Sequence, residues 1–577
     1  MNAPYPALAT KTAPAPAAQN PGSNNIPDSR GLNLFKADGY SQALLKLYLE
    51  PALYEHLLPH FEELGAMAGS TLDELAFTAD QNPPTLSVRH RAGTDQATIH
   101  KHPAYIALEK AAYSRFGLAA MSHRAGVLGW HAPLPPAAKY GLSHLFVQAE
   151  FGLCCPVSMA DSLARTLRRY GDPALVDHVL PQVTALDFDE LKQGAMFMTE
   201  QAAGSDVSAT STQAALEPDG TWRLYGDKWF CSNPDAGFAM VLARSEAAEG
   251  LAGVSLFLLP KTLPDGQPNQ YRILRLKDKL GTRSMASGEI RLEGACAWLV
   301  GTRGKGFQHM ADMINNSRLS NGMRAAGLMR RALTEALFVA RNRTAFGKRL
   351  IEMPLMQRQL MKMLVTTEQA RSVMFQTARA LEKADQGDTT AASLLRILTP
   401  LIKFRACRDA RKVTGDAMEV RGGCGYIEEW VEARLLRDAH LGSIWEGTSN
   451  IVALDVMRSI RRNATLEPLY QHVQTLLSEG LPCTPTLRAL QDQSVEKAFA
   501  LARAASAQEN SPQARQAASA LYNVVSMAAL RWEAGQSEPL KSRALLADNV
   551  LEHKLAPLDP CAMPENRQEW LTLLEVV

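Results

Sequence analysis

The sequence predicts an α+β fold, with an N-terminal helical domain, a central antiparallel β domain and a C-terminal four-helix bundle that carries an appended helical region. Apolar residues recur at helical spacing from Asp38 to about Glu190, alternate as in strands between Gln193 and Val300, and return to helical spacing from Gly306. Because the chain has 577 residues, we expect several domains. We expect a flexible tail (residues 1–34), the N-terminal helical domain (35–190), the β domain (191–300), the C-terminal bundle (301–465) and the appended helical region (466–577).

The N-terminal helical prediction depends on two stretches. Ser41–Leu49 has apolar residues at helical spacing, and Ala149–Tyr170 repeats the pattern until Gly171-Asp-Pro173 stops it. Between them, residues 126–138 form a loop that Gly and Pro interrupt.

The β domain is predicted from short alternating runs. Thr221–Phe230 alternates and is broken by a Gly-Asp turn, while Gly253–Leu259 and Gly288–Leu292 also have strand patterns. Clusters of Pro, Asp, Gly and Asn separate them.

The C-terminal half is predicted to be helical again. Met356–Leu381, Ala391–Val413 and Ser449–Ile460 are long periodic segments with short links, which is typical of a four-helix bundle. Beyond about Leu466, prolines separate the further helices of the appended region.

Composition indicates a globular protein in a reducing compartment. Hydrophobic residues make up 46% and charged residues 21% of the chain. The eight cysteines form no C-x-x-C pair, so we expect no metal site and a cytoplasmic location. No apolar run is long enough to predict a membrane span. Residues 1–23 have no apolar secretion segment and are predicted to be flexible; a transit peptide is the weaker interpretation, because Arg is nearly absent there.

Charge is unevenly distributed although the formal net charge is only +2. Residues 301–462 carry 27 Lys and Arg against 16 Asp and Glu, whereas residues 463–577 carry 9 against 13. The basic central segment could serve phosphate-bearing ligands or nucleic acid.

Two candidate binding stretches belong to the β domain. The first, MFMTEQAAGSD at residues 196–206, is a strand that ends in Thr199, followed by a small-residue turn. Its backbone N–H groups and the hydroxyls of Thr199 and Ser205 could face a ligand, although an ordinary capped loop also explains it. The second is DKWFCSN at residues 227–233. Phe230 could stack on a planar ring while Ser232 hydrogen-bonds it; core aromatics at a hairpin edge are the alternative.

Two further stretches belong to the bundle. RNRTAFGKR at residues 341–349 is a basic break in which Arg343 could bind a phosphate with two N–H groups, and a solvated turn is the alternative. EVRGGCGY at residues 419–426 contains Gly422 and Gly423, which permit a ligand to approach the backbone closely. Neither stretch matches a P-loop or a dinucleotide fingerprint.

The fifth stretch is SIWEGTSNIVALD, residues 443–455. Thr448 or Ser449 would cap the following helix, whose N-terminus favours anionic groups such as a pyrophosphate. Glu446 lies just before that helix, beside Trp445, and partial burial by the indole suits a base that must hold a proton. The alternative is a Glu that only interacts with the helix dipole.

These five stretches, in this order, resemble the acyl-CoA dehydrogenase family of flavoproteins over roughly residues 35–465. The chain is more closely similar to the DNA-alkylation-response branch of that family, in residues 276–287, 444–447 and 454–458 and in the extra C-terminal region. Glu419 and Pro354 stand where many dehydrogenases carry Gln, and both features also look like that branch.

The resemblance implies FAD held between the β domain and the bundle. The residues that it implies around the cofactor are Met198, Thr199, Gly204, Ser205, Phe230, Ser232, Gly422, Gly423, Ile444, Trp445, Gly447, Thr448 and Asn450. Arg343 and Phe346 would reach the cofactor of a neighbouring subunit, which implies a homo-oligomer built as a dimer of dimers.

The resemblance also implies the reaction. Glu446 would remove the α-proton of an acyl-CoA thioester while flavin accepts the β-hydride, with electrons passing to an electron-transfer flavoprotein. Some relatives place the base just before the residue that corresponds to Arg318, a residue expected to support the site; here that position is Ser317.

The alternative function is an alkylation-response flavoprotein that binds double-stranded DNA and keeps only vestigial dehydrogenase activity; a flavin-binding relative with neither role is a third. Because the appended region is acidic, phosphate contacts would fall on the bundle. The candidate cations are Lys403, Arg405, Arg408, Arg411, Lys412, Arg458, Arg461 and Arg462, unless they only form solvated helix faces.

Overall fold

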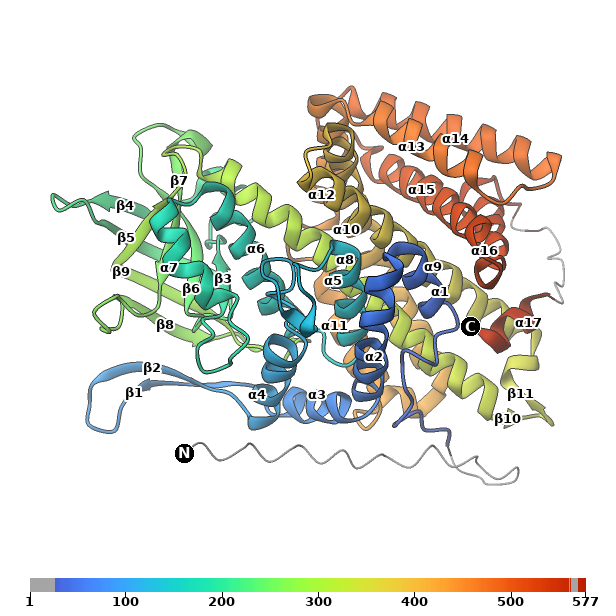
Figure 1. The fold of residues 1–577 in the computed structure, drawn as a ribbon, viewed down its shortest axis with the longest axis horizontal. Coiled ribbons are helices and arrows are strands. Elements are labelled where there is room, and N and C mark those ends of the chain that lie inside the picture. The colour runs from blue at the N-terminus through green and yellow to red at the C-terminus, as the bar shows by residue number, and fades with distance from the viewer. Residues whose placement is uncertain (1–25, 560, 562–568) are drawn as a thin grey trace.

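The computed structural model describes residues 26–559, 561 and 569–577, and it confirms the predicted fold class. A strand-rich domain lies at one side of the molecule and helices fill the remainder, with the C-terminal helices stacked on the far end (Figure 1). The predicted tail at residues 1–23 lies outside the described residues. From residue 26 the chain packs on the body, because Ser29 Oγ donates to Glu335 Oε2 at 2.6 Å and Leu34 is buried.

The N-terminal region is helical with one exception. Its helices are α1 (Ser41–Tyr48), α2 (Pro51–Ala68), α3 (Thr71–Gln81), α4 (Pro103–Lys110), α5 (Pro136–Phe146), α6 (Cys154–Tyr170) and α7 (Pro173–Val183). Several begin with proline, whose fixed φ suits the first helical position. The exception is an antiparallel hairpin that the sequence analysis missed, formed by β1 (Thr85–Arg89) and β2 (Asp95–His100). Its side chains are mostly exposed, so it leaves little apolar alternation in the sequence.

The central domain is one seven-stranded sheet. Its strands are β3 (Gly194–Phe197), β4 (Gln213–Leu216), β5 (Trp222–Ser232), β6 (Phe238–Arg244), β7 (Val254–Pro260), β8 (Tyr271–Leu276) and β9 (Ser287–Val300). The strand order is β3-β6-β4-β5-β9-β7, and β7 also pairs with β6, so most of the sheet closes on itself. Most pairs are antiparallel, while β3 runs parallel to β6.

The turn predicted at Gly226-Asp227 was wrong. Both residues lie inside β5 and remain paired with β9. Gly226 has a φ of 137°, and a Cβ there would lie 3.0 Å from Thr212 Cα. The glycine is therefore needed for close backbone approach within the sheet rather than for a turn.

The bundle begins with a 37-residue helix. Its helices are α8 (Gly306–Asn342), α9 (Pro354–Asp385), α10 (Thr389–Arg421), α11 (Val431–Gly442) and α12 (Ser449–Asn463). A two-residue hairpin, β10 (Thr344–Ala345) with β11 (Lys348–Arg349), joins α8 to α9. The appended helices are α13 (Leu466–Glu479), α14 (Pro485–Ser506), α15 (Ala514–Gln536), α16 (Arg543–Val550) and α17 (Glu569–Val576).

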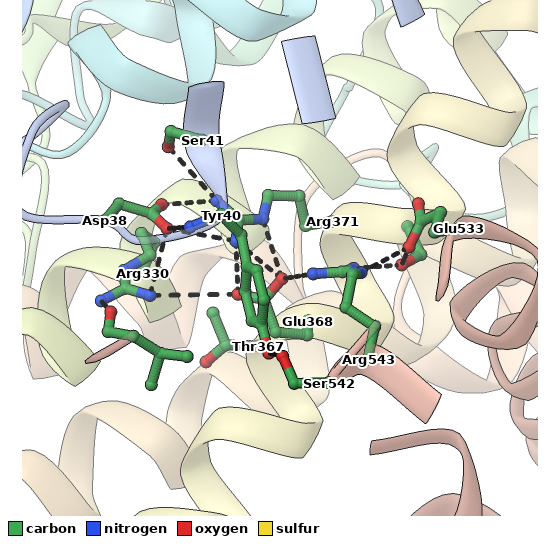
Figure 2. A network of polar contacts seen from close by, with 12 residues as sticks. Asp38, Tyr40, Ser41, Arg330, Thr367, Glu368, Arg371, Glu533, Ser542 and Arg543 are labelled. Atoms are coloured by element: carbon green, nitrogen blue, oxygen red, sulfur yellow. Dashed lines mark hydrogen bonds and ion pairs between the residues drawn. The ribbon is translucent and has the colours of Figure 1, made fainter. Parts of the chain in front are cut away.

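A buried ionic network joins the appended helices to the rest of the chain (Figure 2). Asp38, before α1, pairs with Arg371 of α9, whose Nη2 lies 2.7 Å from Glu368 Oε2. Arg543 of α16 donates to Glu368 at 2.6 Å and to Glu533 of α15 at 2.8 Å. Residues more than 150 positions apart thus share one set of charges.

Among the described helices, none combines the length and apolar character needed to cross a bilayer. The same residues contain no cluster of three or more His, Cys, Asp or Glu side chains suited to hold a metal ion.

Candidate functional site

The loop between α11 and α12 carries the predicted base. Glu446 has a φ of 58° and Gly447 a φ of 100°, so two consecutive residues are left-handed. Glycine adopts this conformation freely, but a glutamate rarely does, and such backbone often marks a functional site. Thr448 occupies the N-cap position of α12, but within the described chain its side chain makes no capping hydrogen bond.

The Glu446 carboxylate is held at one oxygen and free at the other. Ser317 Oγ of α8 donates to Oε1 at 2.7 Å. Oε2 is buried, and no described residue gives it a hydrogen bond. An acceptor in this state is available to a bound molecule.

Two cations fix the loop backbone. Arg318 Nε donates to the Glu446 carbonyl oxygen at 3.0 Å, and its Nη1 pairs with Asp455 of α12 at 2.9 Å. The Lys403 ammonium of α10 donates to the Gly447 carbonyl oxygen. Lys403 is buried, and burial lowers its pKa to about 8. The position of Glu446 therefore depends on contacts from α8 and α10, and no pattern in the sequence indicates that Lys403 would hold this loop.

Aromatic side chains wall the site on the α6 side. Trp445 stacks on Phe151 with ring centroids 6.0 Å apart, and the Arg324 guanidinium lies 4.6 Å from the Trp445 centroid. The indole Nε1 is buried and unpartnered in the described structure. Ile444, just before it, is exposed.

The β domain supplies a second group of predicted residues near one another. Trp229 N donates to the Thr199 carbonyl oxygen at 2.8 Å, which ties the end of β3 to β5. Met198 and Thr199 are half-buried, and Gly204 and Ser205 are exposed in the turn that follows.

Glu200 fixes this turn, a role that the sequence analysis did not assign. Its carboxylate accepts from Lys228 Nζ at 2.7 Å and from Thr212 Oγ1 at 2.6 Å. Burial alone would raise the pKa of Glu200, but the Lys228 charge and these hydrogen bonds lower it to about 2. In the sequence, the Thr199-Glu200 pair before the small-residue turn is the feature from which this role of Glu200 could have been predicted.

Phe230, near the end of β5, exposes an aromatic ring. Its side chain is 55% exposed, and the Lys277 ammonium lies 4.7 Å from the ring centroid. Ser232 is half-buried at the end of β5. An exposed ring next to hydroxyls suits a planar polar ligand.

The loop between β8 and β9 docks this group against the bundle. Thr282 N donates to Asp438 Oδ1 of α11 at 2.6 Å, and a Cβ on Gly281 would lie 2.6 Å from the Arg437 carbonyl carbon. Lys279, in the same loop, lies near enough to Cys155 for their charges to interact. The stretch at residues 276–287 is therefore the contact between the β domain and α11.

The other predicted residues do not join Glu446 within one chain. Arg343 and Phe346 lie at the β10–β11 hairpin, and Phe346 is 98% exposed. The 25 helical positions between Arg318 and Arg343 span roughly 37 Å. Gly422 and Gly423 lie in an exposed turn after α10, separated from the Glu446 loop by α11, and Gly422 has a φ of 76° that requires glycine. Asn450, in the first turn of α12, is exposed and accepts from Arg515 Nη1 at 3.4 Å.

These residues fit a flavin. The exposed Phe230 ring suits the isoalloxazine, and the buried, unpartnered Trp445 Nε1 is a donor that a bound group could satisfy.

Family models match three successive parts of the chain. The adaptive response protein AidB N-terminal domain matches residues 24–190, the acyl-CoA dehydrogenase middle domain residues 195–295, and the acyl-CoA dehydrogenase C-terminal domain residues 304–461.

Individual relatives agree. The putative acyl-CoA dehydrogenase AidB of Escherichia coli is 34% identical over 402 residues, which cover 68% of this chain and 72% of that protein. Acyl-CoA dehydrogenase family member 11 of Caenorhabditis elegans is 36% identical over 325 residues, covering 54% and 53%. The crystal structure of C. elegans ACDH-11 in complex with C11-CoA superposes with a TM-score of 0.85 at 27% identity, covering 96% and 95%. Bd2924 in its apo-form gives 0.80 at 30% identity, covering 88% and 100%. The chain belongs to the acyl-CoA dehydrogenase family of FAD-dependent oxidoreductases, in the branch that carries the AidB N-terminal domain.

Proposed function

We propose that this enzyme removes hydrogen across the Cα–Cβ bond of an acyl-CoA thioester, with Glu446 as the base. One observation carries the proposal: Glu446 Oε2 is buried and receives no hydrogen bond from the described chain, while Ser317 holds Oε1 at 2.7 Å. A base must present a free lone pair at a fixed place, and this carboxylate does so. The acyl-CoA class is supported by C. elegans ACDH-11, which was crystallised with C11-CoA.

FAD, when bound, supplies the acceptor for the β-hydride. Thr199, Ser205, Phe230 and Ser232 would hold its ring from the β domain, with Met198 and Gly204 beside them. Residues 444–450 would contact it from the bundle, including Ile444, Trp445, Gly447, Thr448 and Asn450.

The chain itself handles the proton. Glu446 Oε2 would take the proton from the α-carbon, and the hydrogen bond from Ser317 keeps the other oxygen from competing. Negative charge then develops on the thioester. The buried positive charge of Lys403, which holds the Gly447 carbonyl oxygen, lies near enough to Glu446 to stabilise it. Trp445 and Phe151 exclude water.

An anaerobic titration tests the proposal. The purified yellow protein is mixed with a panel of acyl-CoAs, and flavin absorbance is followed. We expect bleaching with at least one thioester and none with Glu446→Gln. If no thioester bleaches the wild type, or if Glu446→Gln behaves identically, the proposal is rejected.

Oligomerisation is a further part of the proposal. Phe346, Leu355 and Tyr426 are 80% exposed or more. They lie where α8 ends, α9 begins and α10 ends, which the antiparallel packing brings to one end of the bundle. Apolar residues gathered at one end support burial against a second copy, so that Arg343, Phe346, Gly422 and Gly423 would complete a neighbour's cofactor site. Light scattering on wild type and Phe346→Asp tests a dimer of dimers.

Electrons would leave to an electron-transfer flavoprotein, which a coupled dye assay with such a protein tests.

A cytoplasmic location is also proposed. All eight cysteines are free thiols in the structure, which supports a reducing compartment. Fractionation of cells that express the tagged protein tests it.

Double-stranded DNA binding is the second candidate, supported by the AidB N-terminal match and the basic centre of the chain. One predicted contact was wrong: Lys403 is buried on the Gly447 carbonyl. Several of the other predicted cations already have carboxylate partners: Arg405 with Asp409, Lys412 with Asp416, Arg458 with Asp455 and Arg461 with Glu509. Duplex affinity measured against salt tests this candidate, and a flat log–log slope would reject it.

A further inference from the structure

Arg324 is a fully buried cation beside the Glu446 loop. It lies on α8, two helical turns after Ser317 and on the same face. Its Nε reaches the Ser320 carbonyl oxygen at 3.4 Å, a long contact within its own helix. Both terminal nitrogens are buried, and no oxygen or nitrogen of the described chain accepts a hydrogen bond from either; the Cys155 thiol, a weak acceptor, is close enough to interact with the guanidinium. Four N–H donors therefore remain without an oxygen or nitrogen acceptor.

Other buried arginines of the bundle have carboxylate partners, whereas Arg324 has none among the described residues. Arg331, two turns further along α8, pairs with Asp73 at 3.0 Å and with Glu335 at 2.8 Å. Arg421 pairs with Glu335 at 2.7 Å and also with Glu432. No carboxylate of the described residues forms an ion pair with Arg324. The Trp445 and Phe151 rings, with centroids 4.6 and 5.8 Å away, stabilise the charge through their faces but accept none of its N–H groups in the guanidinium plane. An unpaired interior charge is destabilising, so we expect a bound ligand to pair with it.

The guanidinium lies close to the loop that carries the proposed base. Trp445 is adjacent to Glu446 in sequence, and both Arg324 and Glu446 lie near enough to the Cys155 thiol of α6 to influence its pKa. The thiol is therefore flanked by the base and by the unused cation. A substrate whose α-carbon lies against Glu446 Oε2 would extend past Cys155 towards Arg324.

The space left between the neighbouring helices is small. A cavity of about 20 Å³, the size of one water, lies between α5, α6 and α8. Its lining includes Ser143, Ser158 and Ser320 together with the Lys139–Asp161 ion pair, whose atoms lie 2.9 Å apart. Because this cavity holds no more than one water, a long alkyl chain has no room here, which favours a short acyl group.

We propose that Arg324 binds a carboxylate at the far end of the acyl group, so that the preferred substrates are CoA monothioesters of short dicarboxylic acids. This inference rests on the proposed desaturation at Glu446. A guanidinium binds a carboxylate through two parallel N–H···O bonds, which would occupy the donors that the protein leaves free. The reaction itself is unchanged, since the carboxylate only positions the chain.

Equilibrium binding tests the inference separately from turnover. Glu446→Gln holoenzyme is titrated with CoA thioesters of four- to eight-carbon dicarboxylic acids and with monocarboxylic thioesters of equal carbon number, by calorimetry. We expect tighter binding of at least one dicarboxylic thioester than of its partner. Adding Arg324→Gln should weaken the binding of that dicarboxylic thioester about 10- to 100-fold. The affinity for the monocarboxylic thioester of equal carbon number should stay nearly unchanged. Arg324→Lys keeps the positive charge but loses the planar guanidinium, so its affinity for the dicarboxylic thioester should lie between that of the protein that retains Arg324 and that of Arg324→Gln.

Arg169→Gln is the matched control. Arg169 is an exposed arginine of α6 that pairs with Asp312, and its substitution should change neither affinity. The inference is overturned if the protein that retains Arg324 binds monocarboxylic thioesters as tightly as dicarboxylic ones. Equal losses for both classes in Arg324→Gln and Arg324→Lys would also overturn it. Should no thioester bleach the flavin when Glu446 is intact, the desaturation proposal fails, but the binding preference still decides the role of Arg324.

Discussion

Replacing Arg543 by methionine would remove the charge that anchors α16 in the buried network (Figure 2). Arg543 and both of its carboxylate partners are fully buried. Its nitrogens donate to Glu368 at 2.6 Å, to Glu533 at 2.8 Å and to Ser372 at 2.7 Å. Methionine fills much of the volume but supplies no donor, so the effect reports on charge more than on a cavity.

The two partners would respond differently. Glu368 would still pair with Arg371 at 2.7 Å, whereas the hydrogen bonds left to Glu533 among the described residues come from two hydroxyls, Tyr48 at 2.8 Å and Ser372 at 2.7 Å. An uncompensated buried carboxylate costs about 3–5 kcal/mol, a large share of the 5–15 kcal/mol that typically stabilises a folded domain. Adding Glu533→Gln removes the unpaired charge and should recover at least half of the loss.

Urea unfolding followed by tryptophan fluorescence and circular dichroism measures these differences. Arg503→Met, on the exposed face of α14, is the control and should change the free energy of unfolding by less than about 0.5 kcal/mol. The reasoning is refuted if Arg543→Met costs under about 1 kcal/mol, or if Glu533→Gln makes the double variant still less stable.

Three further predictions concern the site and its contacts. Ser317→Ala should lower kcat/KM for the best thioester about 10-fold or more while FAD content stays constant, because the Glu446 carboxylate would lose the donor that orients it; stopped-flow flavin reduction measures this. Burial raises the pKa of Asp438 to about 7, so the folded protein binds more protons than the unfolded one and this carboxyl makes stability fall as pH rises from about 4 to 7. Asp438→Asn should therefore raise the unfolding free energy at pH 8, by at most about 4 kcal/mol, and have little effect at pH 4, as thermal unfolding at both pH values would show. Gly281→Ala would place a methyl group 2.6 Å from the Arg437 carbonyl carbon, and a loss of about 1–3 kcal/mol with weaker FAD retention is expected in thermal unfolding and flavin-release assays.

The sequence predicted those parts of the fold that bury one face of a regular element. The periodic helices and the alternating strands left a clear apolar pattern, whereas the β1–β2 hairpin, with mostly exposed side chains, left almost none. The turn predicted at Gly226 failed because a glycine that permits close backbone approach has the same appearance in sequence as one that permits a turn.

The charged interior was not predictable from sequence. Lys403 is predicted at the surface, as a phosphate contact or as part of a solvated helix face, because lysine is rarely buried, yet it lies buried on the Gly447 carbonyl. Its role depends on packing α10 against a loop 44 residues away. The contact of Ser317 with Glu446 spans 129 residues, so the motif could identify the base but not the group that orients it.

The interior cations Arg318 and Lys403 determine the conformation of the loop that carries Glu446. A glutamate in left-handed backbone costs roughly 1–2 kcal/mol, and the hydrogen bonds that Arg318 and Lys403 donate to two successive carbonyls offset that cost. Because both cations come from long bundle helices, the loop that carries Glu446 is as fixed as the bundle itself. Arg324 takes no part in this support, although it is equally buried and on the same helix as Arg318. A bundle that pairs its other interior arginines with carboxylates has no structural need for an unpaired one beside its base, which is why the substrate is the partner that we assign to it.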